Sequence, residues 1–89
     1  MRVAASERVI LTQLIANGPS YGLALVKGSR GKLTRGGIYV TLGRMEEKGF
    51  VSSADGEGGR RIYRPTALGE RALLAAQLFA GRIRLGTQP

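Results

Sequence analysis

Residues 33–50 constrain the fold of this chain most, because they read as one helix with a clear start and a clear stop. The Thr34 hydroxyl is placed to cap the first turn, and Gly49 can close the helix in the left-handed conformation. Apolar residues recur at helical spacing and predict one buried stripe. The stripe consists of Ile38, Leu42 and Met45.

The opposite face of this predicted helix is almost bare backbone. At about 100° per residue, this face consists of four residues, and two residues with larger side chains lie at its edge. They are Gly36, Val40, Gly43 and Glu47, flanked by Tyr39 and Arg44. Each glycine inside a helix costs about 1 kcal/mol relative to alanine, so the helix would be weak alone. One face of this helix is packed, and the other, called the stripped face below, carries few large side chains. Such a helix favours close approach by a molecule outside the domain.

The charge of the chain indicates what that partner is. Lysine and arginine number 14 against 6 acidic residues, which gives a net charge of +8 in 89 residues. A small domain this basic typically meets a polyanion, most often nucleic acid, although a solvated surface without a partner would show the same charge. The segment that leads into this helix and includes most of it is uniformly positive: from Lys27 to Arg44 there are five basic residues and no acidic residue.

Residue types that carry most catalytic and metal chemistry are missing. The chain has no cysteine and no histidine, which removes thiol chemistry, cysteine-based zinc sites and the commonest general base. Glu46 and Glu47 are adjacent on a helix and therefore face apart. We expect no enzyme activity, no metal and no cofactor. With no signal peptide and no long apolar run, we expect a cytoplasmic protein without a membrane partner.

Two shorter helices are predicted before the central one. Ser6 is placed to cap a helix over residues 6–16, and Ser20 to cap a helix over residues 21–27. Lys32 and Leu33 form a short strand or simply lead into the third helix. Three helices, with a short glycine-containing connection before the third, are the parts of a helix-turn-helix.

After residue 49 the period changes from helical to extended. Residues 50–54 and 60–64 read as two strands joined by a glycine-rich turn. Because a two-stranded hairpin is not stable alone, this hairpin must pack against the helices. Either Ile62 or Tyr63 faces inward, because neighbouring residues on a strand point oppositely. A hairpin with arginines after its tip is interpreted as a wing, and an ordinary edge hairpin protected by its charges is the alternative.

The last predicted element is a helix over residues 67–85, capped by Thr66 and roughly 28 Å long. The preceding elements can cover only its first turns, so we expect the rest of its apolar stripe to form a homodimer. The alternative is packing back onto the first helix within one chain. The stripe consists of Leu68, Ala72, Ala75, Ala76, Phe79 and Ile83, widened by Leu73, Leu74 and Leu78.

Short motifs follow one another in a recognisable order. They are Val9–Leu11, Asn17–Gly22, Gly36–Leu42, Met45–Val51 and Gly59–Thr66. This ordered set resembles the PadR family of bacterial winged-helix transcriptional regulators. The resemblance implies a homodimeric repressor on a partly palindromic operator, with the third helix in the major groove and the wing on the backbone or minor groove. It also places phosphate and groove contacts at Tyr21, Thr34, Tyr39 and Arg61.

We therefore expect an α+β, mainly helical fold: a winged helix-turn-helix over residues 1–65 that binds double-stranded DNA, and a dimerisation helix with a tail over residues 66–89. Phosphate contacts are assigned to exposed cations. They are Arg35, Arg44, Arg60, Arg61 and Arg64, with Lys32 and Lys48 further out. The competing interpretation is a protein-interaction module without operator specificity. The sequence identifies no small-molecule inducer.

For two residues of the stripped face, the sequence leaves two interpretations open. Tyr39 is either a donor to phosphate or sugar, or a half-buried core aromatic. Val40 either touches a thymine methyl group or has no role. Because Gly36 and Gly43 lie beside Val40, few side chains can reach base edges, and specificity is expected to depend on DNA shape.

Overall fold

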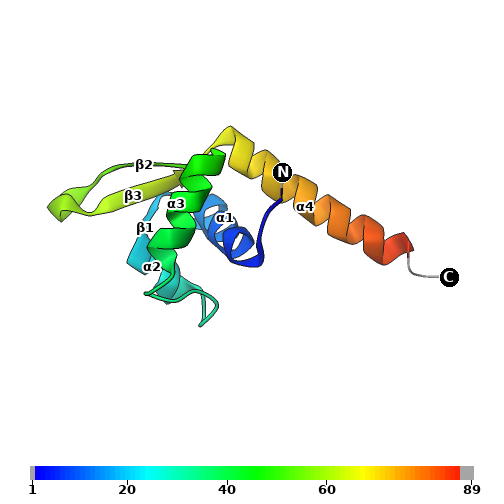
Figure 1. Ribbon diagram of the computed structural model, residues 1–89, viewed down its shortest axis with the longest axis horizontal. Helices are drawn as coiled ribbons and strands as arrows, with labels where there is room; N and C mark the ends of the chain where they lie inside the picture. Colours follow the sequence, from blue (N-terminus) through cyan, green and yellow to red (C-terminus); the bar gives the residue numbers. More distant parts are fainter. Residues whose placement is uncertain (1, 87–89) are drawn as a thin grey trace.

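The computed structural model describes the backbone of residues 2–86 and the side chains of residues 2–79. Its elements follow the predicted order, and the winged helix-turn-helix fold is confirmed (Figure 1). The helices are α1 (Ala5–Asn17), α2 (Gly22–Gly28), α3 (Ile38–Lys48) and α4 (Ala67–Gly86), with a 3-10 turn η1 (Glu57–Gly59). The strands are β1 (Ser20–Tyr21), β2 (Val51–Asp55) and β3 (Arg61–Pro65). The β2–β3 hairpin, called the wing below, extends to one side of the helices, and α4 extends to the other (Figure 1).

A third strand, β1, attaches the wing to the helices. The sheet order is β1–β3–β2, all antiparallel, and Ser20 lies opposite Tyr63 while Tyr21 lies opposite Ile62. The prediction that Ser20 caps the second helix is therefore wrong: its hydroxyl donates to the Gly18 carbonyl at 3.1 Å. A strand of two residues is too short to show an alternating pattern, so only the tertiary pairing defines it.

Tyr63 is the wing residue that faces the core, which decides the choice left open by the sequence. It is buried, whereas Ile62 is partly exposed. Burial, and after it the Glu46 carboxylate, raises the pKa of the Tyr63 hydroxyl, so the phenol stays neutral at ordinary pH.

One hydrophobic core joins the three short helices, the sheet and the first turns of α4. The predicted stripe of α3 is part of it. The core consists of Ile10, Leu11, Leu14, Leu25, Leu33, Ile38, Leu42, Met45, Phe50, Val51, Tyr63 and Leu73. Leu73 was expected on the outward stripe of the last helix, but the start of α4 packs on α1 and buries this side chain. Lys32 and Leu33 form no strand, and they lie in the loop before α3.

The helix α3 begins at Ile38, later than the sequence predicts. A turn precedes it, in which the Thr34 hydroxyl accepts the Gly37 amide hydrogen at 3.1 Å. Thr34 therefore stabilises this turn instead of capping the helix, and Gly36 lies in the turn instead of on the helix face. Two successive glycines disfavour helix by their backbone entropy, which explains the late start.

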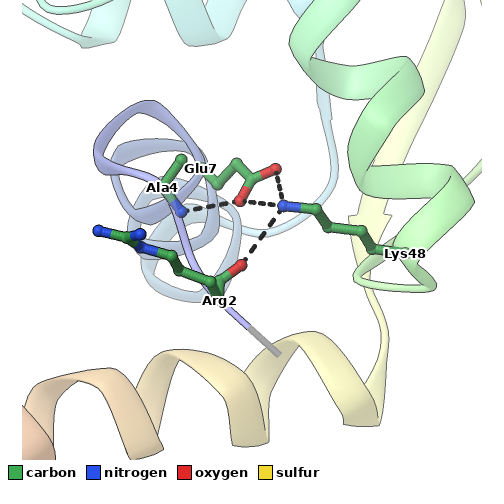
Figure 2. A network of polar contacts seen from close by, with 4 residues as sticks. All are labelled: Arg2, Ala4, Glu7 and Lys48. Carbon is green, nitrogen blue, oxygen red and sulfur yellow. Dashed lines mark hydrogen bonds and ion pairs between the residues drawn. The ribbon is translucent and has the colours of Figure 1, made fainter.

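A partly buried ion pair connects the start of α1 to the end of α3 (Figure 2). The Lys48 amine lies 2.8 Å and 2.9 Å from the two carboxylate oxygens of Glu7 and also donates to the Arg2 carbonyl at 3.3 Å. The same carboxylate accepts the Ala4 amide hydrogen at 2.9 Å, and so caps α1 in the place expected for Ser6. The Lys48 amine is thus engaged within the protein, contrary to its predicted outlying role at phosphate.

The end of α3, the start of β2 and the start of α4 meet in one tight junction, formed by Gly49, Phe50, Thr66 and Gly69. Gly49 closes α3 with a φ of 81°, as predicted. The Thr66 hydroxyl accepts the Gly69 amide hydrogen at 3.0 Å, which confirms it as the cap of α4, and donates to the Gly49 carbonyl. The Thr66 amide donates to the Phe50 carbonyl at 3.0 Å. A Cβ at position 69 would overlap that carbonyl oxygen.

We predict that Gly69→Ala lowers the free energy of unfolding by about 2 kcal/mol, because backbone must move to admit the methyl group. Gly43→Ala is the matched control: it lies inside α3, and its Cβ would meet nothing within 4 Å. It should raise the free energy of unfolding by up to about 1 kcal/mol. Urea unfolding at one protein concentration measures both. Equal effects would contradict the packing described for the junction.

The two residues of the ion pair should respond unequally to substitution, because only the Glu7 carboxylate is buried. Lys48→Met leaves the Glu7 carboxylate, which is 2% exposed, without its countercharge, and should lower the free energy of unfolding by about 3 kcal/mol. Glu7→Gln leaves the Lys48 side chain, which is 35% exposed and open to water, so its effect should be smaller. Urea unfolding at neutral pH compares the two variants. A larger loss for Glu7→Gln would show that burial of the carboxylate does not dominate the pair.

Candidate nucleic-acid interface

The face of α3 opposite its buried stripe is open to solvent. Tyr39 is 52% exposed and is not part of the hydrophobic core, and Val40, Arg44 and Glu47 are exposed beside it. Around Gly43 there is free space where a side chain would stand. The stripped face predicted for the central helix therefore exists, although it begins at Tyr39 instead of at the preceding turn.

The Tyr39 ring is held by a close approach of α2 to α3. A Cβ on Gly22, the first residue of α2, would lie 2.7 Å from the Cε1 atom of Tyr39. A larger residue at position 22 would displace the ring from this place. The tyrosine is thereby placed at the start of α3 with half of its surface in water.

Tyr21 and the wing are joined by an aromatic stack. The guanidinium carbon of Arg60 lies 4.3 Å from the centroid of the Tyr21 ring, a distance typical of a cation–π contact. Between this stack, Tyr39 and the start of α2 the surface is hollowed. The hollow is lined by Tyr21, Leu23, Ala24, Tyr39, Gly59, Arg60 and Arg61. Two tyrosines and two arginines from three different elements therefore border one concave, basic surface.

Arg61, at the border of this hollow, is held by hydrogen bonds from across the hairpin. Its Nε donates to the Ser53 hydroxyl at 2.8 Å, and that hydroxyl donates to the Glu46 carboxylate at 2.7 Å. Its Nη1 lies 3.4 Å from an Asp55 carboxylate oxygen. The sequence did not predict that Ser53 and Glu46 hold this arginine, because only the strand register and the packing of β2 on α3 bring them together.

The remaining predicted contact residues are dispersed around this surface. Thr34, Lys32 and Arg35 are exposed in the loop before α3, and Arg64 is exposed on β3. No ion pair within residues 2–79 involves Lys32, Arg35, Arg64, Arg44 or Arg60. Their charge is therefore available to an outside anion.

A second basic hollow lies between α1 and the loop after α2, and the sequence did not predict it. It is lined by Arg8, Val9, Thr12, Gln13, Gly28, Ser29, Arg30 and Lys32. Arg30 has a φ of 55°, the only positive φ of a non-glycine residue in the described chain. This hollow adds to the positive potential around the start of α3.

The surface as a whole combines the exposed outer face of α3, the wing and cations that form no ion pair within residues 2–79. Helices of this kind enter the major groove of DNA while flanking cations bind phosphates. None of the helices in residues 2–86 combines the length and the hydrophobicity that a bilayer-spanning segment needs.

Comparisons with known proteins agree with this geometry. The sequence model of the transcriptional regulator PadR-like family matches residues 10–75. A PadR family transcription regulator from Clostridium difficile R20291 is 26% identical, with a TM-score of 0.78 over 91% of this chain and 92% of that one. A PadR family regulator from Eggerthella lenta DSM 2243 is 31% identical, with a TM-score of 0.72 over 89% and 70% of the two chains.

A more distant structure has the same fold. The PcaV transcriptional regulator from Streptomyces coelicolor superimposes with a TM-score of 0.80, over 91% of this chain and 57% of that one. At 19% identity this similarity concerns the fold alone. No protein of curated function matches the chain.

Proposed function

The chain belongs to the PadR-like family of transcriptional regulators and is thus a DNA-binding regulator of transcription, and on that premise we propose that it acts as a homodimeric repressor on a partly palindromic operator. Residues 1–65 would bind DNA, and residues 66–89 would supply the dimer helix and tail. The observation that carries this proposal is the exposed outer face of α3 beside the arginine-bearing wing. Regulators of this family are generally non-enzymatic, and we propose the same for this chain.

In the proposed complex, α3 lies in the major groove. Tyr39 donates to phosphate or sugar, Val40 faces a thymine methyl group, and Arg44 reaches a phosphate. Since Gly43 offers no side chain, few base edges are read directly, and part of the specificity comes from DNA shape. Flanking phosphates are contacted by the remaining residues of the interface. They are Tyr21, Lys32, Thr34, Arg35, Gly36 through its backbone, Arg60, Arg61 and Arg64.

The proposed dimer forms through α4. Figure 1 shows this helix leading away from the other elements, so most of its length has no neighbouring element within residues 2–86. Phe79 is 63% exposed, and Leu68, Leu74, Ala75 and Leu78 are exposed too, while Ala72 and Ala76 are partly buried. The Ile83 side chain lies outside the described residues. Apolar surface of this kind on one projecting helix favours association with a second copy.

Selection of duplexes from a random DNA pool tests the proposal directly. We expect an inverted repeat to be recovered, because each half-site would meet one subunit of a twofold dimer. Affinity for the selected duplex should fall steeply with salt, since each phosphate contact releases counterions. Recovery of no preferred sequence would favour a protein-docking module instead.

Arginine variants add a matched control to the same measurement. Arg44→Ala, on the outer face of α3, should lower the slope of log affinity against log salt by about one. Arg71→Ala removes the same charge from an exposed position of α4 and should change the slope less. An equal change for both variants would place the DNA away from α3.

We predict that Phe79→Asp yields a monomer, because it places a charge in the proposed seam between two copies of α4. Operator affinity should then fall by at least about tenfold, since two linked half-site contacts become one. Gln77→Asp puts the same charge on an exposed position of α4, about 160° around the helix, and should leave both properties unchanged. Sedimentation gives the mass and a shift assay the affinity. A folded Phe79→Asp protein with dimer mass and full affinity would place the dimer contact elsewhere.

A further inference from the structure

One polar network links the wing to α3 without taking part in the core. Asp55 lies directly opposite Arg61 in the hairpin, and Ser53 lies opposite Tyr63, two residues further along β3. Side chains at alternate strand positions share a face, so Ser53, Asp55 and Arg61 are neighbours on one face of the wing. Glu46 meets this face from α3 and accepts the hydrogen bond of the Ser53 hydroxyl.

The two ends of this network differ in strength. Ser53 is held on both sides by short hydrogen bonds, 2.8 Å from Arg61 Nε and 2.7 Å to the Glu46 carboxylate. The contact of Arg61 with Asp55 is long, at 3.4 Å, and both side chains are open to water, 55% and 88% exposed. Exposed pairs of this kind contribute little to stability. Asp55 is therefore easily displaced, whereas the Ser53 hydrogen bond fixes the Nε edge of the guanidinium.

An arginine held in this way is prepared for a phosphate. The guanidinium has five N–H donors, and the bond to Ser53 uses only the one on Nε. The two terminal amino groups remain and can donate together to two phosphate oxygens. A free arginine side chain would lose its rotamer freedom on binding DNA, and prior fixation removes most of that loss.

We propose that Ser53 and Glu46 are positioning residues that hold Arg61 for a DNA phosphate, which replaces Asp55 at the guanidinium on binding. The inference rests on the proposed operator binding. It adds two residues to the interface that are expected to touch no DNA. It also makes the position of the wing arginine depend on α3, so that the helix and the wing approach DNA as one rigid unit.

Neighbouring serines on β2 provide the test. Ser53→Ala removes the hydroxyl that holds Arg61, and should weaken binding to the selected duplex by about three- to tenfold, the usual range for one lost hydrogen bond. Ser52→Ala removes the same atom from an exposed position on the opposite face of the strand and should not change affinity. Ser53→Thr keeps a hydroxyl and should restore most of the affinity. Thermal unfolding of each variant checks that the fold is retained.

A double-mutant cycle then separates positioning from a general effect on the wing. If Ser53 acts through Arg61, Ser53→Ala should have no further effect in the Arg61→Ala protein. Equal affinities of Ser53→Ala and Ser52→Ala, or an undiminished effect in the Arg61→Ala background, would overturn the inference while leaving DNA binding intact. Failure of the unmodified protein to bind any duplex would instead overturn the proposed function, and this inference with it.

Discussion

The arrangement of this molecule depends on the absence of a side chain at Gly69. The first turn of α4 lies so close to the Phe50 carbonyl that a methyl group would overlap it. At the same place the Thr66 hydroxyl caps α4 and donates to the carbonyl of Gly49, the residue that ends α3. The helix that meets DNA in the proposal, the wing and the helix proposed to form the dimer therefore all leave from one junction. Their relative directions are fixed by backbone contacts, which deform much less than side-chain contacts.

The elements that could be predicted from the sequence are those with local causes. The buried stripe of α3 follows from helical periodicity, Gly49 from the left-handed conformation that ends a helix, and Thr66 from a short side chain before a long apolar run. The strand β1 could not be predicted, because Ser20 and Tyr21 become a strand only by pairing with β3. The burial of Leu73 depends in the same way on the angle between two helices.

The features of the candidate site also separate into those with local causes and those that depend on contacts between elements. Exposed cations could be predicted from charge and turn position. The exposure of Tyr39 could not, because its place at the edge of the outer face of α3 fits both a surface residue and a core residue. Contacts across elements were missed. The hydrogen bonds of Ser53 depend on the register of the hairpin and on its distance from α3, and the pairing of Lys48 with Glu7 spans 41 residues. No local pattern carries such information, because both partners are ordinary polar residues in the sequence.

The open space around Gly43 has a consequence for how such a regulator can change. This position faces outward from α3, and a new Cβ there would meet no atom within 4 Å. A substitution at residue 43 therefore requires no repacking of the stripe behind it, and it gains helix propensity. In the proposed complex position 43 faces the major groove, where arginine is the commonest side chain to recognise the Hoogsteen edge of guanine. A single substitution at residue 43 can thus add a base contact while the core residues stay unchanged. The preferred DNA sequence can therefore evolve without loss of the fold.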